Sequence, residues 1–436
     1  TNTSGSSLGT IKIPAGSASA TVEIIPISDN VTEKNIACFE VVADSLYGIA
    51  GDSQFSVGVF DGPLWTMYEL SVAGGYTNIL SFASGSSSGG TTNAVKVVGG
   101  GQYGYYYGTN WIVVDQDGVW TSPSFTFANL EIANFYSISD YPWVAVGAKG
   151  QSARVNQLTG IDFNLPDLAI APSAAYAINR SGSFIGGLGT LSNGVAHPTY
   201  WTLSGGTWSK YDLSDGLSTN WSGEIRGVNS GFQAAGVTDA VYSGSGLGTI
   251  RVGFRSKAST APVSLSFNSA TGVGDLLHAP GKSGSQNLAC RANFVNGSGS
   301  AVGGYLYGGA TIHPAFWPNS SLASDSVPIA LQTWAPKLKN SVVDLECDAL
   351  CVNDSGKIVG WSSTTTNSNP TRAVMRFSAS NQASDWIDLN DRHFTAGIPT
   401  NFVLTTANYI DNSGVIVANG TRGGSTFAVV LIPRGN

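Results

Sequence analysis

The sequence predicts an all-β protein, and three observations support that prediction. Charged residues make up only 11% of the 436 residues, and 55 glycines leave many positions at which the backbone can turn. Apolar residues alternate over short stretches, and the spacing typical of helices is almost absent. A unit of strand, tight turn and strand also returns several times along the chain, which indicates an array, a solenoid or a propeller.

The repeated unit is clearest at residues 349–361 (ALCVNDSGKIVGW). Its turn consists of Asn, Asp, Ser and Gly, the residues that most readily reverse a backbone between two strands. The same unit returns at residues 177–187 and 294–304, and weaker copies lie at residues 228–231 and 410–414. Each copy therefore predicts a hairpin.

The full units continue in a shared way after the turn. The pattern A-x-x-I-N-x-x-G-x-I-V-G is followed by H-P/A-x-F/Y-W at residues 197–201 and 313–317. A strand with a Trp and an acid comes next, at residues 208–213 and 385–389. This pattern resembles the HAF repeats of bacterial extracellular proteins. The resemblance implies a repeat architecture more than it implies an activity.

Seven such units fit into residues 63–436, so we predict a seven-bladed β-propeller. The seventh unit ends at residues 429–433 without its last strand. Residues 65–70 (WTMYEL) match residues 208–213 (WSKYDL) almost position by position. We therefore expect residues 65–70 to pair as the outermost strand of the last blade and to close the ring.

Residues 1–62 form a separate domain in this interpretation. Alternating apolar residues mark four strands, which begin with residues 9–16 (GTIKIPAG). Their order resembles the later part of a Calx-beta domain, a seven-stranded β-sandwich, so we predict a partial β-sandwich. Acidic loop residues bind calcium in that family, which implies a calcium site at Asp29, Glu33 and Asp61. The alternative is that these three are polar turn residues without a metal.

A partial sandwich leaves apolar faces and strand edges that something must cover. The chain begins at Thr1 without an initiator Met, so we expect a piece of a longer precursor. The cover could come from upstream sequence, from packing on the propeller or from strand exchange with a neighbouring subunit.

The charge balance limits the partners. The net charge is −7, which disfavours nucleic acid and anionic membranes, and no apolar run approaches the roughly 18 residues of a membrane span. Low Lys with abundant Ser, Thr, Gly and Asn is typical of secreted bacterial surface proteins. We expect an extracellular or cell-surface location.

The four cysteines are Cys38, Cys290, Cys347 and Cys351. On one extended strand, Cys347 and Cys351 would lie about 13 Å apart, too far for a disulfide. Cys290 and Cys347 each lie six residues before the turn Asn of their unit. We therefore predict a Cys290–Cys347 disulfide, with buried thiols as the alternative.

Residues that break the repeat predict the ligand site. Five positions before the turn Asn, successive units carry Glu224, Arg291 and Asp348. If the first strand of each blade lines the channel, these three form a charged arc. Asp344, Glu346 and Asp348 alternate and so share one face of an extended strand. We predict a polar or cation-binding pocket from these five residues; the alternative is a solvated loop with ordinary ion pairs.

The two candidate catalytic histidines, His197 and His313, occupy the same repeat position, which favours a structural role. The sequence contains no HExxH, GxSxG or phosphate-loop motif. Our first hypothesis is therefore a non-catalytic surface module that binds a protein or glycan partner. The second is a glycan-active hydrolase or lyase with a site on the axial face, which would need two carboxylates about 5–10 Å apart.

Overall fold

The computed structural model divides the chain into two compact units, Thr1–Leu64 with Arg434–Asn436, and Trp65–Pro433. The first unit contains the described strands β1 (Lys34–Glu40) and β2 (Gln54–Phe60), which pair antiparallel. The structure describes residues 34–40, 54–60, 63–70, 77–87, 90–99, 110–114, 120–121, 134–139, 144–149, 152–157 and 162–434, the last without 216, 242–248, 260–262, 269–272, 281–288, 308–310, 321–327, 332–345, 364–370, 378–385, 393 and 413. The other predicted strands of the β-sandwich lie outside these residues.

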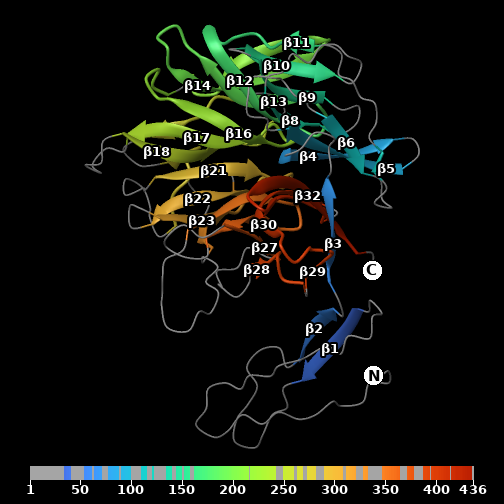
Figure 1. Cartoon of the computed structure of the whole chain (residues 1–436). Coiled ribbons are helices and arrows are strands. Elements are labelled where there is room, and N and C mark those ends of the chain that lie inside the picture. Colours follow the sequence, from blue (N-terminus) through green and yellow to red (C-terminus); the bar gives the residue numbers. More distant parts are fainter. Residues whose placement is uncertain are drawn as a thin grey trace, which may run out of the picture. The chain divides into compact units, whose positions relative to one another are not determined.

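The second unit is all-β among the described residues and consists of small sheets that follow one another along the chain (Figure 1). The first sheets are formed by β4 (Thr77–Ser87), β5 (Gly90–Gly99), β6 (Asn110–Val114) and β7 (Trp120–Thr121); by β8 (Asn134–Ile138), β9 (Val144–Lys149), β10 (Ser152–Gln157) and β11 (Asp162–Asn164); and by β12 (Ile170–Ile178), β13 (Phe184–Thr190), β14 (Ala196–Ser204) and β15 (Thr207–Asp212). Each is an antiparallel meander, as the hairpin turns in the sequence predict.

The same arrangement continues to the C-terminus. The later sheets are formed by β16 (Gly223–Val228), β17 (Ala234–Val241) and β18 (Thr249–Arg255); by β21 (Cys290–Val295), β22 (Ala301–Tyr307), β23 (Thr311–Trp317) and β24 (Ile329–Ala330); by β25 (Cys347–Val352), β26 (Ile358–Ser362), β27 (Arg372–Arg376) and β28 (Trp386–Asp388); and by β29 (Thr395–Ala396), β3 (Trp65–Leu70), β32 (Ser425–Pro433), β31 (Ile416–Arg422) and β30 (Val403–Ile410). A two-stranded ribbon, β19 (Phe267–Asn268) with β20 (Val273–Gly274), follows β18.

Consecutive sheets pack face to face. β8 contacts β4, β12 contacts β9, β16 contacts β13, β21 contacts β17, β25 contacts β22 and β30 contacts β26. The core lies between these faces, and Trp201 and Trp317 are its largest fully buried side chains. Their indole Nε1 atoms donate to the carbonyl oxygens of Pro166 and His278, at 2.8 and 2.7 Å, so the polar end of each ring is satisfied inside the core.

A β-bulge recurs between the first two strands of the repeats. In β21 the register shifts between Ala292 and Phe294. A Cβ placed on Gly303 would lie 2.0 Å from the carbonyl oxygen of Arg291, a distance that no side chain tolerates. The repeated glycine is therefore required by the close approach of the bulged strand. A Cβ on Gly187, Gly236 or Gly360 would come just as close to a backbone carbonyl oxygen, that of Ala174, Glu224 or Asp348 respectively.

The turn asparagines hold consecutive repeats together. The side-chain oxygen of Asn296 accepts from the backbone N–H of Ser300 at 2.8 Å, which closes its own turn. The amide Nδ2 of Asn229 donates to the carbonyl oxygen of Asn296 at 2.8 Å, that of Asn296 to Asn353 at 3.0 Å and that of Asn353 to Asp411 at 2.9 Å. The side-chain oxygen of this Asn therefore closes its own turn, and its side-chain nitrogen links its repeat to the next one.

The strand β3 joins the C-terminal sheet, as the sequence predicts. It pairs antiparallel with β32, with Trp65 opposite Pro433 and Leu70 opposite Ala428. The indole Nε1 of Trp65 donates to the carbonyl oxygen of Gly414 at 3.0 Å. β3 is not the outermost strand, however, because β29 pairs parallel with its other edge. Sequence matching to another repeat could not foresee this extra two-residue strand.

Candidate binding site

A network of charged side chains joins the first strands of three neighbouring sheets. Arg291, on β21, donates through Nη2 to Oδ2 of Asp348, on β25, at 2.6 Å. Asp348 is 1% exposed, and the amide of Asn293 also donates to its two oxygens at 3.1 Å. Burial raises the pKa of the Asp348 carboxyl, and the neighbouring Arg291 and Asn293 work against that rise.

Arg226 and Glu224, both on β16, extend this network. The Nε and Nη2 of Arg226 contact Oε1 of Glu224 at 2.8 and 2.7 Å. The Nη1 of Arg226 donates to Oδ1 of Asn293 at 3.2 Å. Asn293 therefore bridges the two ion pairs, because its oxygen faces Arg226 and its nitrogen faces Asp348.

Three of the five predicted ligand residues thus meet. The structure brings Glu224, Arg291 and Asp348 into one network, as the arc hypothesis expects. Glu346 is half-buried, and its contacts in the described part of the chain are made by its backbone carbonyl, with Ser363. Asp344 lies outside the described residues, so the shared face predicted for residues 344–348 stays a prediction.

A pocket of about 250 Å³ opens beside this network, between the sheet of β16–β18 and the sheet of β21–β24. Three arginines are among its lining residues, and none of the acidic residues paired with them is. Its lining residues are Arg226, Val237, Arg251, Ala289, Cys290, Arg291, Gly304, Tyr305, Leu306 and Ile312. Each arginine is paired with a carboxylate outside the lining. The arginine side chains suit an anionic ligand, whereas the sequence predicted a polar or cation-binding pocket.

Arg226, Arg251 and Asn293 belong to this site but were not predicted from the sequence. Arg226 lies two residues after Glu224, so the period of a strand could have placed both on one face. Arg251 lies on β18, the third strand of its sheet, and reaches the pocket only because the neighbouring sheet packs against it. No local pattern marks that proximity.

The predicted disulfide between Cys290 and Cys347 is wrong. Both residues are buried and neither forms a disulfide. The sulfur of Cys290 accepts from the N–H of Gly253 at 3.3 Å and so faces the preceding sheet. Cys347 packs in a cluster with Val302 and Phe316, which also belong to its preceding sheet. Equivalent positions point in the same direction from one repeat to the next, so these two thiols do not face each other.

Cys290 and Cys351 are not nucleophiles. Burial raises the pKa of both thiols to about 12. A thiol with that pKa is protonated at neutral pH and unreactive. Cys290 lines the pocket without supplying a reactive group to it.

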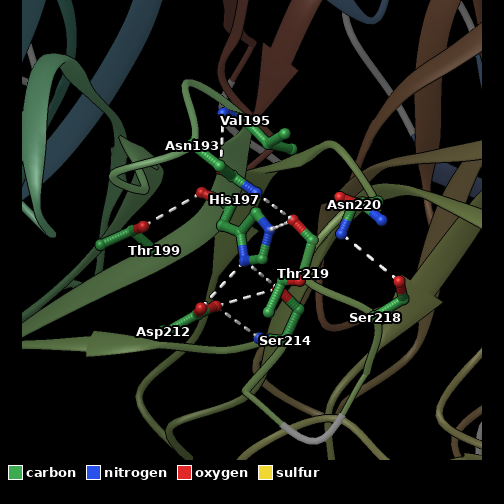
Figure 2. Close-up of polar contacts among 9 residues, drawn as sticks. All are labelled: Asn193, Val195, His197, Thr199, Asp212, Ser214, Ser218, Thr219 and Asn220. Atoms are coloured by element: carbon green, nitrogen blue, oxygen red, sulfur yellow. Dashed lines mark hydrogen bonds and ion pairs between the residues drawn. The ribbon is translucent and has the colours of Figure 1, made fainter.

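His197 lies in a buried polar cluster that resembles a catalytic triad only in composition (Figure 2). Its Nδ1 lies 2.9 Å from both Asp212 Oδ2 and Ser214 Oγ, and its Nε2 lies 3.2 Å from the carbonyl oxygen of Thr219. A triad places the Ser and the acid on opposite ring nitrogens, whereas both are on Nδ1 here. His197 is also 1% exposed, which keeps substrate away.

The same cluster explains the charge of His197. Burial alone would lower the pKa of His197, but the hydrogen bond and charge of Asp212 and the Thr219 carbonyl outweigh it and raise that pKa. Burial would raise the pKa of Asp212, and His197 and Ser214 lower it instead. Two acceptors at the two ring nitrogens therefore favour the imidazolium form, which ties the strand of His197 to the loop at Thr219.

The predicted calcium ligands Asp29, Glu33 and Asp61 lie outside the described residues. Within the part of the chain that the structure does describe, no group of three or more His, Cys, Asp or Glu side chains could hold a metal ion. Over those same residues, no helix has the length and apolar character needed to cross a membrane.

No family model matches the sequence, and no curated protein matches it significantly. Similar solved structures include the β-propeller domain of the Trilobed protease from Pyrococcus furiosus (8% identity, 83% of this chain and 96% of that chain, TM-score 0.45). They also include virginiamycin B lyase from Staphylococcus aureus (9%, 84% and 99%, 0.36) and the β-propeller lectin of Aleuria aurantia (9%, 83% and 97%, 0.33). The structural neighbours of this all-β chain are thus β-propellers of varied function.

Proposed function

We propose that this chain is a non-catalytic, extracellular or cell-surface binding and assembly module. Its repeats form a seven-bladed propeller of the HAF type, and β3 closes the ring. The pocket between the sheets of β16–β18 and β21–β24 is the site that receives a glycan or protein partner. The composition, which is poor in Lys and rich in Ser, Thr, Gly and Asn, supports the extracellular location.

The contacts between sheets support a closed ring. Each sheet packs on the next along the chain, and β4, in the first sheet, also contacts β30, β31 and β32, in the last. The strand β3 precedes the first sheet and hydrogen-bonds into the last, so one strand connects the two ends of the repeat array. Such a clasp is how a propeller protects its edges.

The observation that carries the binding function is the pocket itself. A concave site with an apolar wall and a few converging polar groups is the usual form of a small-ligand site. Here two of the three lining arginines, Arg226 and Arg291, are held by ion pairs at 2.7 and 2.6 Å, which gives them defined positions before any ligand arrives. Preorganisation of this kind suits binding.

The enzyme hypothesis requires a different arrangement of acids. A glycosidase needs one carboxyl that can donate a proton and a second that is available to act as base or nucleophile. Glu224 and Asp348 both accept from arginine side chains, and Asp348 is buried. The enzyme hypothesis is kept as an outcome of the experiment below.

For residues 1–62 we propose a partial Calx-beta-like β-sandwich covered first of all by upstream sequence, with packing on the propeller as the second alternative and strand exchange between subunits as the third. We also propose that Asp29, Glu33 and Asp61 bind calcium. Light scattering on the purified chain tests strand exchange, because a strictly monomeric protein eliminates it. Calorimetry with calcium on the wild type and on Asp29→Asn tests the metal site, which is eliminated if the two titrations are equally flat.

The experiment for the pocket compares the wild type with Ala289→Phe on a glycan array and in a turnover screen on polysaccharides. Ala289 lines the pocket, so a phenyl ring at this position fills it without removing an ion pair. We expect binding without turnover by the wild type and loss of binding by the variant, at an unchanged unfolding temperature. Equal binding by both proteins would show that the pocket is not the site. Turnover that disappears in Glu224→Gln or Asp348→Asn would establish the enzyme instead.

A further inference from the structure

The pocket contains hydrogen-bond donors that the protein itself leaves unused. The Nε of Arg291 is buried and has no hydrogen-bond partner in the described structure, while the Nη2 of the same side chain holds Asp348. Buried donors are normally satisfied, so the unpaired Nε marks Arg291 as a lining residue whose hydrogen-bonding capacity the protein does not use up.

Arg251 supplies a second set of loosely held donors. Its side chain is 48% exposed, and its Nη1 reaches Asp239 and Ser222 only at 3.4 Å each. Contacts this long are weak, so Arg251 can turn toward an incoming acceptor at little cost. Arg291 and Arg251 therefore present donors to one cavity from two neighbouring sheets.

We propose that this pocket binds the carboxylate of an acidic sugar ring, of the hexuronate class. This inference rests on the proposed function and specifies its ligand. A carboxylate has the planar, two-oxygen geometry that a guanidinium group recognises with paired hydrogen bonds. Arg291, whose side chain is 35% exposed, can make one such contact, and Arg251 can make another in place of its long contact with Asp239.

The rest of the lining fits the body of a sugar ring. Tyr305, Leu306 and Ile312 also line the pocket and offer apolar surface against which the C–H face of a ring can pack. The volume of about 250 Å³ lies below the roughly 300–1,000 Å³ typical of drug-sized ligands, so it suits one ring.

An acidic peptide fits these observations less well. Peptides are commonly bound in an extended groove or by pairing with a free strand edge, and this pocket is instead an open depression of about 250 Å³ lined by side chains. The sugar is therefore the ligand class that the lining favours, and an acidic peptide is one of the outcomes that the experiment can return.

The test uses two probes that differ only in the group of interest. Methyl glucuronide carries a carboxylate where methyl glucoside carries a hydroxymethyl group, and both are titrated into the full chain by calorimetry or ligand-observed NMR. We expect the glucuronide to bind at least about tenfold more tightly, because hydrogen bonds to a charged acceptor are the strong ones. Arg251→Gln should weaken glucuronide binding about five- to tenfold. Arg392→Gln, an equal charge change at an exposed arginine away from the pocket lining, should leave it unchanged.

Several results would overturn the inference. Equal affinity for the two sugars, no glucuronide binding, or equal loss in Arg251→Gln and Arg392→Gln would each contradict it. Tighter binding of an acidic tripeptide than of the glucuronide would replace the sugar by a peptide. If neutral glycans bind and Ala289→Phe abolishes that binding, the proposed function stands and only the anionic ligand is wrong.

Discussion

The side-chain nitrogen of Asn296 donates a hydrogen bond to the backbone carbonyl oxygen of Asn353, 3.0 Å away, across the boundary between two repeats. The side-chain oxygen of Asn296 closes its own turn at the same time. An aspartate would keep the second role and lose the first. The amide therefore couples turn formation to the stacking of repeats.

The first prediction concerns this coupling. Asn296→Asp should lower the free energy of unfolding by about 1–3 kcal/mol, because the buried carbonyl of Asn353 loses its donor and faces a negative charge. Asn193→Asp is the matched control, since the exposed amide of Asn193 also donates to a carbonyl, that of Thr219. The control should change stability by less than about 0.5 kcal/mol. Equal effects in urea denaturation would remove the special role of the turn asparagine.

The second prediction concerns the glycine opposite each bulge. Gly303→Ala should destabilise the protein by about 2–3 kcal/mol or more, because its methyl group would overlap the carbonyl oxygen of Arg291. Gly231→Ala is the control, since a Cβ at Gly231 meets only Asn229, at an ordinary 3.4 Å. Thermal unfolding measures both variants. A harmless Gly303→Ala would mean that the bulged strand can move aside.

The third prediction is a dependence of stability on pH through His197. Because folding raises the pKa of His197 above its ordinary 6.5, its contribution is complete below pH 6.5 and disappears as the pH rises through the folded-state pKa. Because folding lowers the pKa of Asp212, the stability that its carboxylate contributes is lost only below pH 3.8. The wild type should therefore unfold at a lower temperature at pH 9 than at pH 6.

Two variants isolate that effect. His197→Gln and Asp212→Asn each remove one partner of the ion pair, so both should reduce the change in unfolding temperature between pH 6 and pH 9. If either variant keeps the full pH dependence of the wild type, the cluster in Figure 2 is not its source.

The fourth prediction concerns closure by β3. A chain that begins at residue 63 keeps β3, whereas a chain that begins at residue 73 loses its pairing with β32 and the ion pair between Glu69 and Arg422. The shorter chain should unfold at least about 5 °C lower, since a loss of several kcal/mol shifts the midpoint by that much in a protein of this size. Equal unfolding temperatures would mean that β3 does not join the ends of the array.

The sequence was sufficient to predict the hairpins, and the reason is local. The side-chain oxygens of Asn296 and Asn353 close their own turns, and Gly303 faces the bulged strand of its own repeat, so each of these requirements can be read from one repeat. The pairing of β3 with β32 was also predictable, because residues 65–70 carry the pattern of a last strand. The extra strand β29 carries no such pattern.

The pocket was only partly predictable, because it forms where different sheets meet. Glu224, Arg291 and Asp348 could be aligned through the repeat, but Arg251 enters the site from a third strand and Asn293 bridges two sheets. The repeat also led to one wrong prediction, the disulfide between Cys290 and Cys347. Side chains at equivalent repeat positions point the same way, each toward its preceding sheet, whereas a disulfide needs two side chains that face each other.

Ligand contact at the pocket is the most direct measure of the proposed function. Ile312 lines the pocket and Ile358 is fully buried in the neighbouring sheet, so their side-chain methyl groups serve as probe and control. In a titration of methyl-labelled protein with methyl glucuronide, followed by NMR, we expect the Ile312 signal to shift and the Ile358 signal to stay, with no product signals from the sugar. An Ile312 signal that does not shift at saturating glucuronide would contradict an acidic-sugar site in this pocket, and the appearance of sugar products would contradict a non-catalytic module.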